Sequence, residues 1–266
     1  MLQRRVRLLL DSVDIFGFSV ALNPQKVIES HFAMAEIREQ CSLVFACLNP
    51  HSLVEAHSNP AFTEALSNTH VLAADGIGIT GAAQLLGLKP PVRFTGSDCF
   101  EVVCNLAQSD NRLRVFLLGS TNAVLEKLVA YHKRTHPNVD IVGVYSPPFI
   151  KNIKEWDATD AIDAINRSNA DVLWVSMTAP KQELWVHAHF TELNVKFIGS
   201  VGAVFDFYAG TVRRPGKIWQ VLGLEWLGRL IQEPKRLWRR TAVSGSKFFL
   251  ITVAAMANTY VLNKKD

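Results

Sequence analysis

The sequence predicts an α/β protein whose central sheet is mostly parallel and carries helices on both faces. Between Leu43 and Ile198, short apolar runs of strand length alternate with longer segments of helical spacing, an order that builds parallel sheets. Hydrophobic residues make up 48% of the chain, which is enough for a large core. The 266 residues accommodate one such domain, predicted at 1–212, and a C-terminal appendage at 213–266.

Strands are predicted where short apolar runs are bounded by turn-forming residues. The run Leu43–Leu48, for example, ends at Asn49-Pro50, and Val115–Leu118 is closed by Gly119. The predicted strands are one or two within 6–20, where Val13–Phe18 partly alternates, then Leu43–Leu48, Val71–Ala74, Val115–Leu118, Ile141–Tyr145, Asp171–Ser176 and Val195–Ile198.

Helices are predicted between these strands, where apolar residues recur at helical spacing after residues that favour a helix start. Asn23-Pro24, for example, precedes Val27, Ile28 and Phe32, which fall on one helical face. The predicted helices run from Pro24 to about Gln40, then over Pro60–Leu66, Ile79–Leu88, Asp98–Gln108, Ala123–His136 and Trp156–Ser168, and a last one opens at Met177–Glu183.

A candidate site lies in the stretch Val71–Asp98. The predicted strand Val71–Ala74 ends at Asp75, next to Gly76 and Gly78. Open α/β sheets bind ligands at the carboxyl ends of their strands, and glycines let a substrate come close to the backbone. Asp75 is therefore a candidate general base. The alternative is that Asp75 only caps the helix that follows, and the local pattern favours neither.

The same stretch also matches the dinucleotide-binding pattern G-x-G-x-x-G, from Gly76 to Gly81. That pattern requires a second strand ending in an acidic residue about 20 positions later. Here Pro90-Pro91 and the polar turn Thr95–Asp98 follow instead. The pattern therefore does not predict NAD binding, although an NAD-dependent oxidoreductase is the first rival hypothesis to weigh.

The C-terminal part is basic and rich in tryptophan. Residues 213–240 contain eight Arg or Lys and two Glu, a charge of +6 in a chain whose formal total is +4. A basic block on a nearly neutral body predicts a local anionic partner rather than nucleic acid. Trp219, Trp226 and Trp238 lie in the same block, and Trp with Arg is typical of helices at a membrane interface. The apolar tail Phe248–Leu262 is short for a membrane span.

Residues that often bind metals give no metal-site pattern. Cys41, Cys47, Cys99 and Cys104 form no C-x-x-C pair, so they are expected to be reduced thiols of a cytosolic protein. His187 and His189 are two residues apart, which is the wrong spacing for two ligands on one helix face, so a structural role is expected. The sequence also has no D-x-D pair that could clamp a metal-bound diphosphate. Counter-charge for such a group would come from Arg, Lys or helix N-termini.

Five blocks in the family's order resemble the WecG/TagA/CpsF family, glycosyltransferase family 26, over residues from about 11 to 240. They are Ala74–Gly78, Arg93 with Thr95–Asp98, Ala179–Glu183, Gly223–Leu227 and Glu233–Arg236. The resemblance implies a Rossmann-like core with a membrane-touching C-terminal appendage. It also implies an inverting, metal-independent transferase that moves a sugar from a UDP-sugar to a polyprenyl-diphosphate-linked sugar at the inner membrane face, in cell-surface polysaccharide biosynthesis. The oligomeric state stays open, a homo-oligomer included.

The resemblance also implies roles for individual residues. Asp75 matches the proposed base, Gln182 matches the Gln of the P-K-Q-E motif, and Arg93 matches an Arg beside the pocket; these three are the expected catalytic residues. Arg229, Arg236 and Arg239 match arginines thought to reach the acceptor diphosphate. At 100° per helical residue, Arg236 would lie within about 20° of Arg229 and Arg239 within about 80°, so the three could line one side even if Pro234 kinks the helix. The expected substrate-binding residues are Asn49, Gly76, Gly78, Thr95, Asp98, Gly119, Pro180, Lys181, Gly202 and Asp206.

Several of these positions have simpler explanations. Pro180 and Glu183 also suit an ordinary helix start, which leaves Gln182 unexplained; a Gln amide can donate to and accept from a sugar or uracil. Asp206 either binds a hydroxyl group or caps a helix, and the turn at Gly119 either receives a phosphate or binds nothing.

Two departures from the family's pattern leave the donor sugar open between UDP-ManNAc, UDP-ManNAcA and UDP-glucose types. They are Ser176-Met177-Thr178, before the P-K-Q-E motif, and Ser146–Phe149, where Gly-Tyr-Phe is usual. A non-catalytic membrane scaffold of a polysaccharide assembly complex is the second rival hypothesis, against which an intact Asp75 argues.

Overall fold

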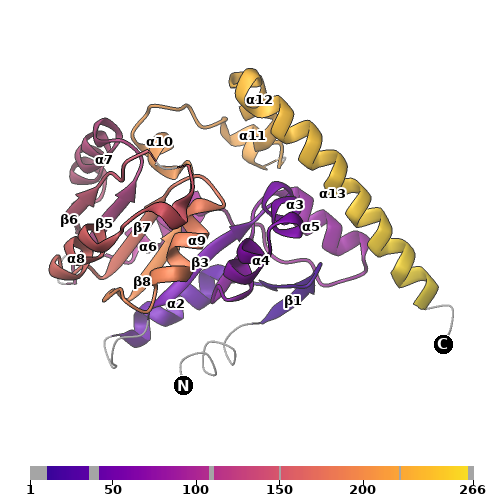
Figure 1. Cartoon of the computed structure of the whole chain (residues 1–266), viewed down its shortest axis with the longest axis horizontal. Helices are drawn as coiled ribbons and strands as arrows, with labels where there is room; N and C mark the ends of the chain where they lie inside the picture. Colours follow the sequence, from indigo (N-terminus) through magenta and orange to yellow (C-terminus); the bar gives the residue numbers. More distant parts are fainter. Residues whose placement is uncertain (1–10, 36–41, 108–110, 150, 222, 263–266) are drawn as a thin grey trace.

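The computed structural model describes residues 11–35, 42–107, 111–149, 151–221 and 223–262 (Figure 1). Its centre is a six-stranded sheet in which every neighbouring pair is parallel, with the strand order β4-β3-β8-β7-β5-β6. The predicted parallel sheet is confirmed. The strands are β3 Leu43–Leu48, β4 Val71–Ala74, β5 Leu113–Gly119, β6 Val139–Tyr145, β7 Val172–Ser176 and β8 Phe197–Ser200.

Helices cover both faces of the sheet because successive strand residues point to opposite sides. Phe45, Val115 and Trp174 face one buried cluster with α2 Pro24–Ala35, α6 Gly96–Asn105, α7 Asn122–Thr135 and α10 Val204–Tyr208. Val44 and Leu173 face the opposite side. That side is covered by α3 Pro50–Ser58, α4 Pro60–Ser67, α5 Ile77–Leu85, η1 Ile153–Glu155, α8 Thr159–Arg167 and α9 Lys181–His189.

Two early strands form a separate hairpin. β1 Ser12–Ile15 pairs antiparallel with β2 Phe18–Ala21. Phe16 and Gly17, both with positive φ, make the turn. Ile15, Phe18 and Val20 are buried in the cluster beneath α3 and α4, so the hairpin extends the core beyond the edge strand β4. The part of the prediction that covers residues 6–10 lies outside the described residues.

The sequence analysis did not predict helix α3, because it interpreted Asn49-Pro50 only as the end of a strand. The structure begins α3 at Pro50, with Asn49 as the N-cap and Ser52 completing a capping box. An Asn cap followed by Pro at the first helical position is a regular helix start. The helix has few apolar residues, so its helical periodicity is weak in the sequence. The predicted ends at Gln40 and Gln108 lie outside the described residues.

Two boundaries also differ from the prediction. The last strand lies two residues later than predicted, because the amides of Lys196 and Phe197 still bond to the Asp171 carbonyl before the ladder begins. The helix expected from Trp156 starts at Thr159, because Trp156 is extended and the Asp157 carboxylate accepts from the amide of Thr159.

The C-terminal region consists of three helices, α11 Lys217–Val221, α12 Glu225–Gln232 and α13 Pro234–Leu262. The break expected at Pro234 is complete, so that Arg229 belongs to α12 whereas Arg236 and Arg239 belong to α13. Pro234 has no amide hydrogen to continue the hydrogen-bond ladder, so α12 ends before it and α13 begins with it. The side chains of Arg236 and Arg239 lie outside the described residues.

Helix α13 lies along the outer side of α3 and α5 (Figure 1). His51 Nδ1 is 2.8 Å from Ser244 Oγ, and a Cβ on Gly78 would lie 2.5 Å from Pro50 Cγ and 3.6 Å from the Phe248 ring. Gly78 therefore allows α3, α5 and α13 to pack closely. No helix in the described part of the chain is long and apolar enough to cross a membrane.

Candidate functional site at the carboxyl edge of the sheet

Asp75 and Asn49 are adjacent because they follow neighbouring strands. Asn49 comes directly after β3 and Asp75 directly after β4, and the amide of Asp75 donates to the carbonyl of Leu48 at 2.8 Å. The Asn49 side chain accepts from the amides of His51 and Ser52. Those bonds orient its amide nitrogen, which donates to Asp75 Oδ2 at 3.5 Å. Asn49 thus caps α3 and touches the candidate base at the same time.

The Asp75 side chain is half-buried at the end of β4, and the burial of its carboxyl group raises its pKa to about 6. The negative charges of Glu225 and Asp98 add to the rise, whereas the Asn49 hydrogen bond and the positive charge of Arg93 oppose it. The capping alternative for Asp75 fails, because the N-cap of α5 is Gly76 and no side chain caps that helix. A carboxylate whose pKa is raised toward neutrality at a strand end is chemically suited to accept a proton.

The block from Arg93 to Asp98 lies beside Asp75. Arg93 forms an isolated parallel bridge with Ala74, which places it next to the end of β4. Thr95 caps α6, and Asp98 Oδ2 accepts from both the amide and the hydroxyl of Thr95. Thr95 and Asp98 therefore have a structural role at the start of α6, and their substrate-binding role stays a prediction.

An ion pair that the sequence analysis missed joins the segment after α10 to the start of α12. Arg214 Nε is 3.1 Å from Glu225 Oε1, and both side chains are about four-fifths buried, at 19% and 20% exposed. Gly223 has a positive φ of 69°, and a Cβ there would lie 1.9 Å from Ile77. Only glycine allows this approach. The start of α12 is thereby held against the loop that carries Asp75.

Arg229, an expected acceptor-binding residue, lies above α10. Its guanidinium carbon is 5.2 Å from the centre of the Phe207 ring, a cation–π distance. The neighbouring Asp206 accepts a hydrogen bond from the Thr211 hydroxyl at 3.1 Å, and no side chain caps α10. The capping alternative for Asp206 is thus wrong, while its hydroxyl-binding role stays a prediction.

The other half of the edge contains the P-K-Q-E motif. Pro180 precedes α9, and Lys181 Nζ lies 5.4 Å from the centre of the exposed Phe149 ring. Gln182 is 4% exposed. Its side-chain oxygen accepts from the amides of Met177 and Gly202, and its nitrogen donates to Glu183. The sequence places these residues at the right edge but does not reveal that the Gln182 amide is engaged within the protein.

Gly119 belongs to the same edge, at the end of β5. Its φ is 117°, and a Cβ there would lie 2.3 Å from the Ser176 carbonyl oxygen. The adjacent amide of Ser120 donates to that oxygen at 3.1 Å. Glycine therefore allows the exits of β5 and β7 to come together, and a phosphate-binding role for this turn stays a prediction.

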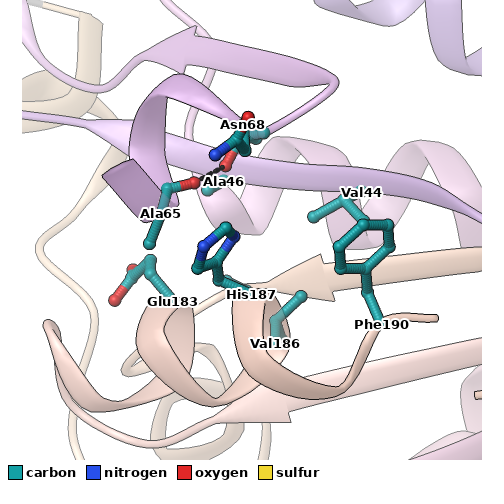
Figure 2. Close-up of a pocket in the computed structure, with 10 residues that line it drawn as sticks. Val44, Ala46, Ala65, Asn68, Glu183, Val186, His187 and Phe190 are labelled. Carbon is teal, nitrogen blue, oxygen red and sulfur yellow. Dashed lines mark hydrogen bonds between the residues drawn. The ribbon is translucent and has the colours of Figure 1, made fainter. Parts of the chain in front are cut away.

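A small pocket lies away from this edge, between α4, α9 and strand β3. Figure 2 shows Glu183 and His187 of α9 on one side of it and Ala65 on the other. None of the predicted site residues lines it. His187 lies 3.8 Å from Glu64 and His189 2.8 Å from Glu192, so both histidines have the structural contacts expected of them.

The described cysteines are free thiols in or beside the core. Cys99 and Cys104 are buried, and Cys47 is half-buried; Cys41 lies outside the described residues. Across the described ranges, no three His, Cys, Asp or Glu side chains gather as ligands for a metal ion.

The sequence is similar to those of known proteins. The model of the Glycosyl transferase WecG/TagA/CpsF family matches residues 13–261. A protein of Bacillus spizizenii (strain ATCC 23059 / NRRL B-14472 / W23) is 28% identical over 211 residues, 79% of each chain. One of Bacillus subtilis (strain 168) is 29% identical over 215 residues, 80% of this chain and 78% of its own. Both are named N-acetylglucosaminyldiphosphoundecaprenol N-acetyl-beta-D-mannosaminyltransferase.

These matches cover most of the chain and include both the edge around Asp75 and the C-terminal helices. They favour neither the oxidoreductase nor the scaffold hypothesis, because the named relatives are transferases. The chain belongs to the WecG/TagA/CpsF family of glycosyltransferases.

Proposed function

We propose that this protein transfers a sugar of the N-acetylmannosamine type from a UDP-sugar to a polyprenyl-diphosphate-linked N-acetylglucosamine, and inverts the anomeric carbon. The names of the two Bacillus relatives support the transferred sugar and the lipid-linked acceptor. The half-buried carboxyl group of Asp75, at the end of β4 beside Asn49 and with a raised pKa, is the observation that carries the chemistry.

In this reaction Asp75 takes the proton of the acceptor hydroxyl. That oxygen attacks the anomeric carbon from the face opposite UDP, the bond to the diphosphate oxygen breaks, and UDP leaves. A single displacement of this kind inverts the carbon. Asn49 orients the carboxylate through its long hydrogen bond, and the adjacent Arg93 holds positive charge at the same place.

Charge on the leaving diphosphate is balanced by side chains rather than by a metal ion in this proposal. Lys181 lies at the start of α9, and Arg229 lies above α10. Guanidinium groups pair with phosphate oxygens in a bidentate manner. Arg236 and Arg239 are proposed to contribute on the family resemblance alone.

The C-terminal helices are proposed to rest on the anionic inner face of the plasma membrane, where the lipid-linked acceptor enters the site. Support comes from a face of α13 that points away from the protein and exposes large apolar side chains, among them Trp238, Phe249, Val253 and Met256. Trp226 of α12 is also 49% exposed. Exposed Trp together with a basic sequence is typical of interfacial helices.

The test is a transfer assay with UDP-ManNAc, UDP-ManNAcA and UDP-glucose, each offered with polyprenyl-diphosphate-linked N-acetylglucosamine. We expect product with UDP-ManNAc, the inverted configuration at the new linkage, and the same rate with and without EDTA. No product from any donor would contradict the proposed reaction. Product that disappears with EDTA and returns with Mg²⁺ or Mn²⁺ would contradict only the metal-independent step.

A further inference from the structure

The side chain of Gln182 is buried and its amide is committed to the protein itself. Its oxygen accepts from the amide of Met177 at 3.2 Å and from that of Gly202 at 3.1 Å. Its nitrogen donates to Glu183 Oε1 at 2.8 Å. A carbonyl oxygen has two lone pairs, so both acceptor positions of Gln182 are filled. The side chain therefore cannot also accept a hydrogen bond from a donor sugar.

Glu183 helps to fix which way the Gln182 amide points. Glu183 is 6% exposed, and its Oε1 accepts from the Gln182 nitrogen. This acceptor and the two backbone donors together select the amide orientation in which the Gln182 nitrogen faces Glu183 and the oxygen faces the two backbone amides. A reversed amide would set oxygen against carboxylate and nitrogen against two donors. The Glu183 side chain also lines the small pocket between α9 and α4 (Figure 2).

The two amides held by Gln182 belong to different strand exits. Met177 directly follows β7, and Gly202 follows β8. A second bond joins the same exits, from the Ser176 hydroxyl to the Gly202 carbonyl. The amide of Ser120, after β5, donates to the Ser176 carbonyl at 3.1 Å. The loops after three strands are thus tied together at the carboxyl edge, and the side chains of Gln182 and Ser176 both bridge the exits of β7 and β8.

We propose that Gln182 and Glu183 form a buried clamp that sets the spacing of the loops after β7 and β8. In this account Gln182 is a positioning residue, and the loops that it joins contact the donor. The link to the donor rests on the proposed function; the clamp itself rests only on the bonds described above. Gln182 of the P-K-Q-E motif thus has a different role from the direct ligand contact expected from sequence.

The clamp is tested by amide hydrogen exchange, measured by NMR in the full chain without any substrate. Gln182→Met has similar size and lacks both amide groups. We expect exchange at Met177 and Gly202 to accelerate at least about tenfold, because each amide loses its acceptor. The exposed Gln84→Ala on α5 is the control and leaves both amides protected. Unchanged exchange at both amides in Gln182→Met would overturn the clamp.

Variants of Glu183 test the orientation step. Glu183→Gln keeps an acceptor for the Gln182 nitrogen and should retain protection, whereas Glu183→Leu should accelerate exchange at both amides. The double variant Gln182→Met/Glu183→Leu should be no worse than Gln182→Met alone, because both changes remove the same unit. Additive losses, or a Glu183→Leu protein with full protection, would overturn the role of Glu183.

Kinetics then separate positioning from direct contact. We expect Gln182→Met and Glu183→Leu to raise the KM for the UDP-sugar by a similar factor, about tenfold, with a smaller change in kcat. A raised KM in Gln182→Met together with a normal KM in Glu183→Leu and unchanged exchange would show a direct ligand contact. A wild-type protein that UDP does not stabilise thermally would refute the proposed donor, while the exchange data would still decide the clamp.

Discussion

Asp75 and Gln182 lie at the same edge of one parallel sheet, yet they differ in how many hydrogen bonds their side chains make within the protein. Within the described residues, the Asp75 carboxylate receives one hydrogen bond, from Asn49 at 3.5 Å. The Gln182 amide makes three, all shorter. Asp75 follows β4 at the outer end of the sheet, and Gln182 opens α9 after β7. Sequence reasoning gave both residues the same kind of role.

The difference indicates that one part of the edge has a structural role and another part a chemical role. A buried polar group rigidifies its surroundings when most of its hydrogen bonds are made within the protein, as three of the four possible ones are for the Gln182 amide. A buried carboxyl with few hydrogen bonds is costly to ionise, and such groups gather at functional sites. We conclude that the Gln182 side holds the edge in shape and that the Asp75 side is available for chemistry.

The largest effect is expected from Asp75→Asn. Asn has nearly the same shape but cannot accept the acceptor's proton, so kcat should fall by about 10²–10⁴. The KM for the UDP-sugar should stay close to that of the wild type, because the shape of the edge is kept. Steady-state kinetics with saturating lipid-linked acceptor measures both constants. Turnover near the wild-type rate would remove Asp75 from the reaction.

The same variant should be more stable than the wild type above pH 6. The folded-state pKa of Asp75 is about 6, raised from an ordinary value of 3.8. The stabilisation by the protonated form is therefore complete below pH 3.8 and is lost as the pH rises through 6. Asn cannot ionise, so at pH 7.5 the free energy of unfolding should increase by up to about 3 kcal/mol.

Chemical unfolding of both proteins at pH 7.5 and at the lowest pH at which both stay folded measures this difference. The gain should shrink toward low pH. Gln182→Met provides the contrast, because a broken clamp lowers stability at both pH values. An Asp75→Asn protein that is less stable than the wild type at pH 7.5 would show that the carboxylate supports the fold.

A smaller effect is expected at the ion pair between Arg214 and Glu225, at the start of α12. Arg214→Gln leaves Glu225 partly buried without its partner and should lower kcat/KM about tenfold, because the start of α12 is less firmly held. The control is Arg112→Gln, which breaks an exposed pair with Asp140, 47% and 43% exposed, and should change activity little. Equal activities in the two variants would show that α12 is not positioned by Arg214.

Much of the fold could be predicted because buried strands are recognisable from short apolar runs in the sequence. Runs such as Leu43–Leu48 and Val71–Ala74 are uniformly apolar, and both strands were placed at their observed limits. Helix α3 was missed because its pattern is weak and its best signal, an Asn cap followed by Pro50, was attributed to the preceding strand. Pro234 was known to interrupt a helix, but only the structure shows two separate helices there.

The site was harder to predict because its contacts join distant segments. Asp75 and Asn49 could be placed together, since neighbouring parallel strands end at one edge. The pairing of Arg214 with Glu225 could not, because nothing in either residue's surroundings specifies the partner. Gln182 had the right location, but its hydrogen bonds to Met177 and Gly202 depend on the exact path of two loops. The sequence therefore located the edge of the sheet, but it did not show which polar side chains are already hydrogen-bonded within the protein.

The pH dependence of kcat/KM for the wild type and Asp75→Asn tests the division between the two sides most directly, because this constant reports ionisations of the free enzyme. A base must be ionised to act, so wild-type activity should rise with pH through a midpoint near 6, the raised pKa of Asp75, and then level off. The residual activity of Asp75→Asn should lack that rise. A wild-type midpoint near pH 4, or the same rise near pH 6 in the variant, would contradict the assignment of Asp75 as the reactive group.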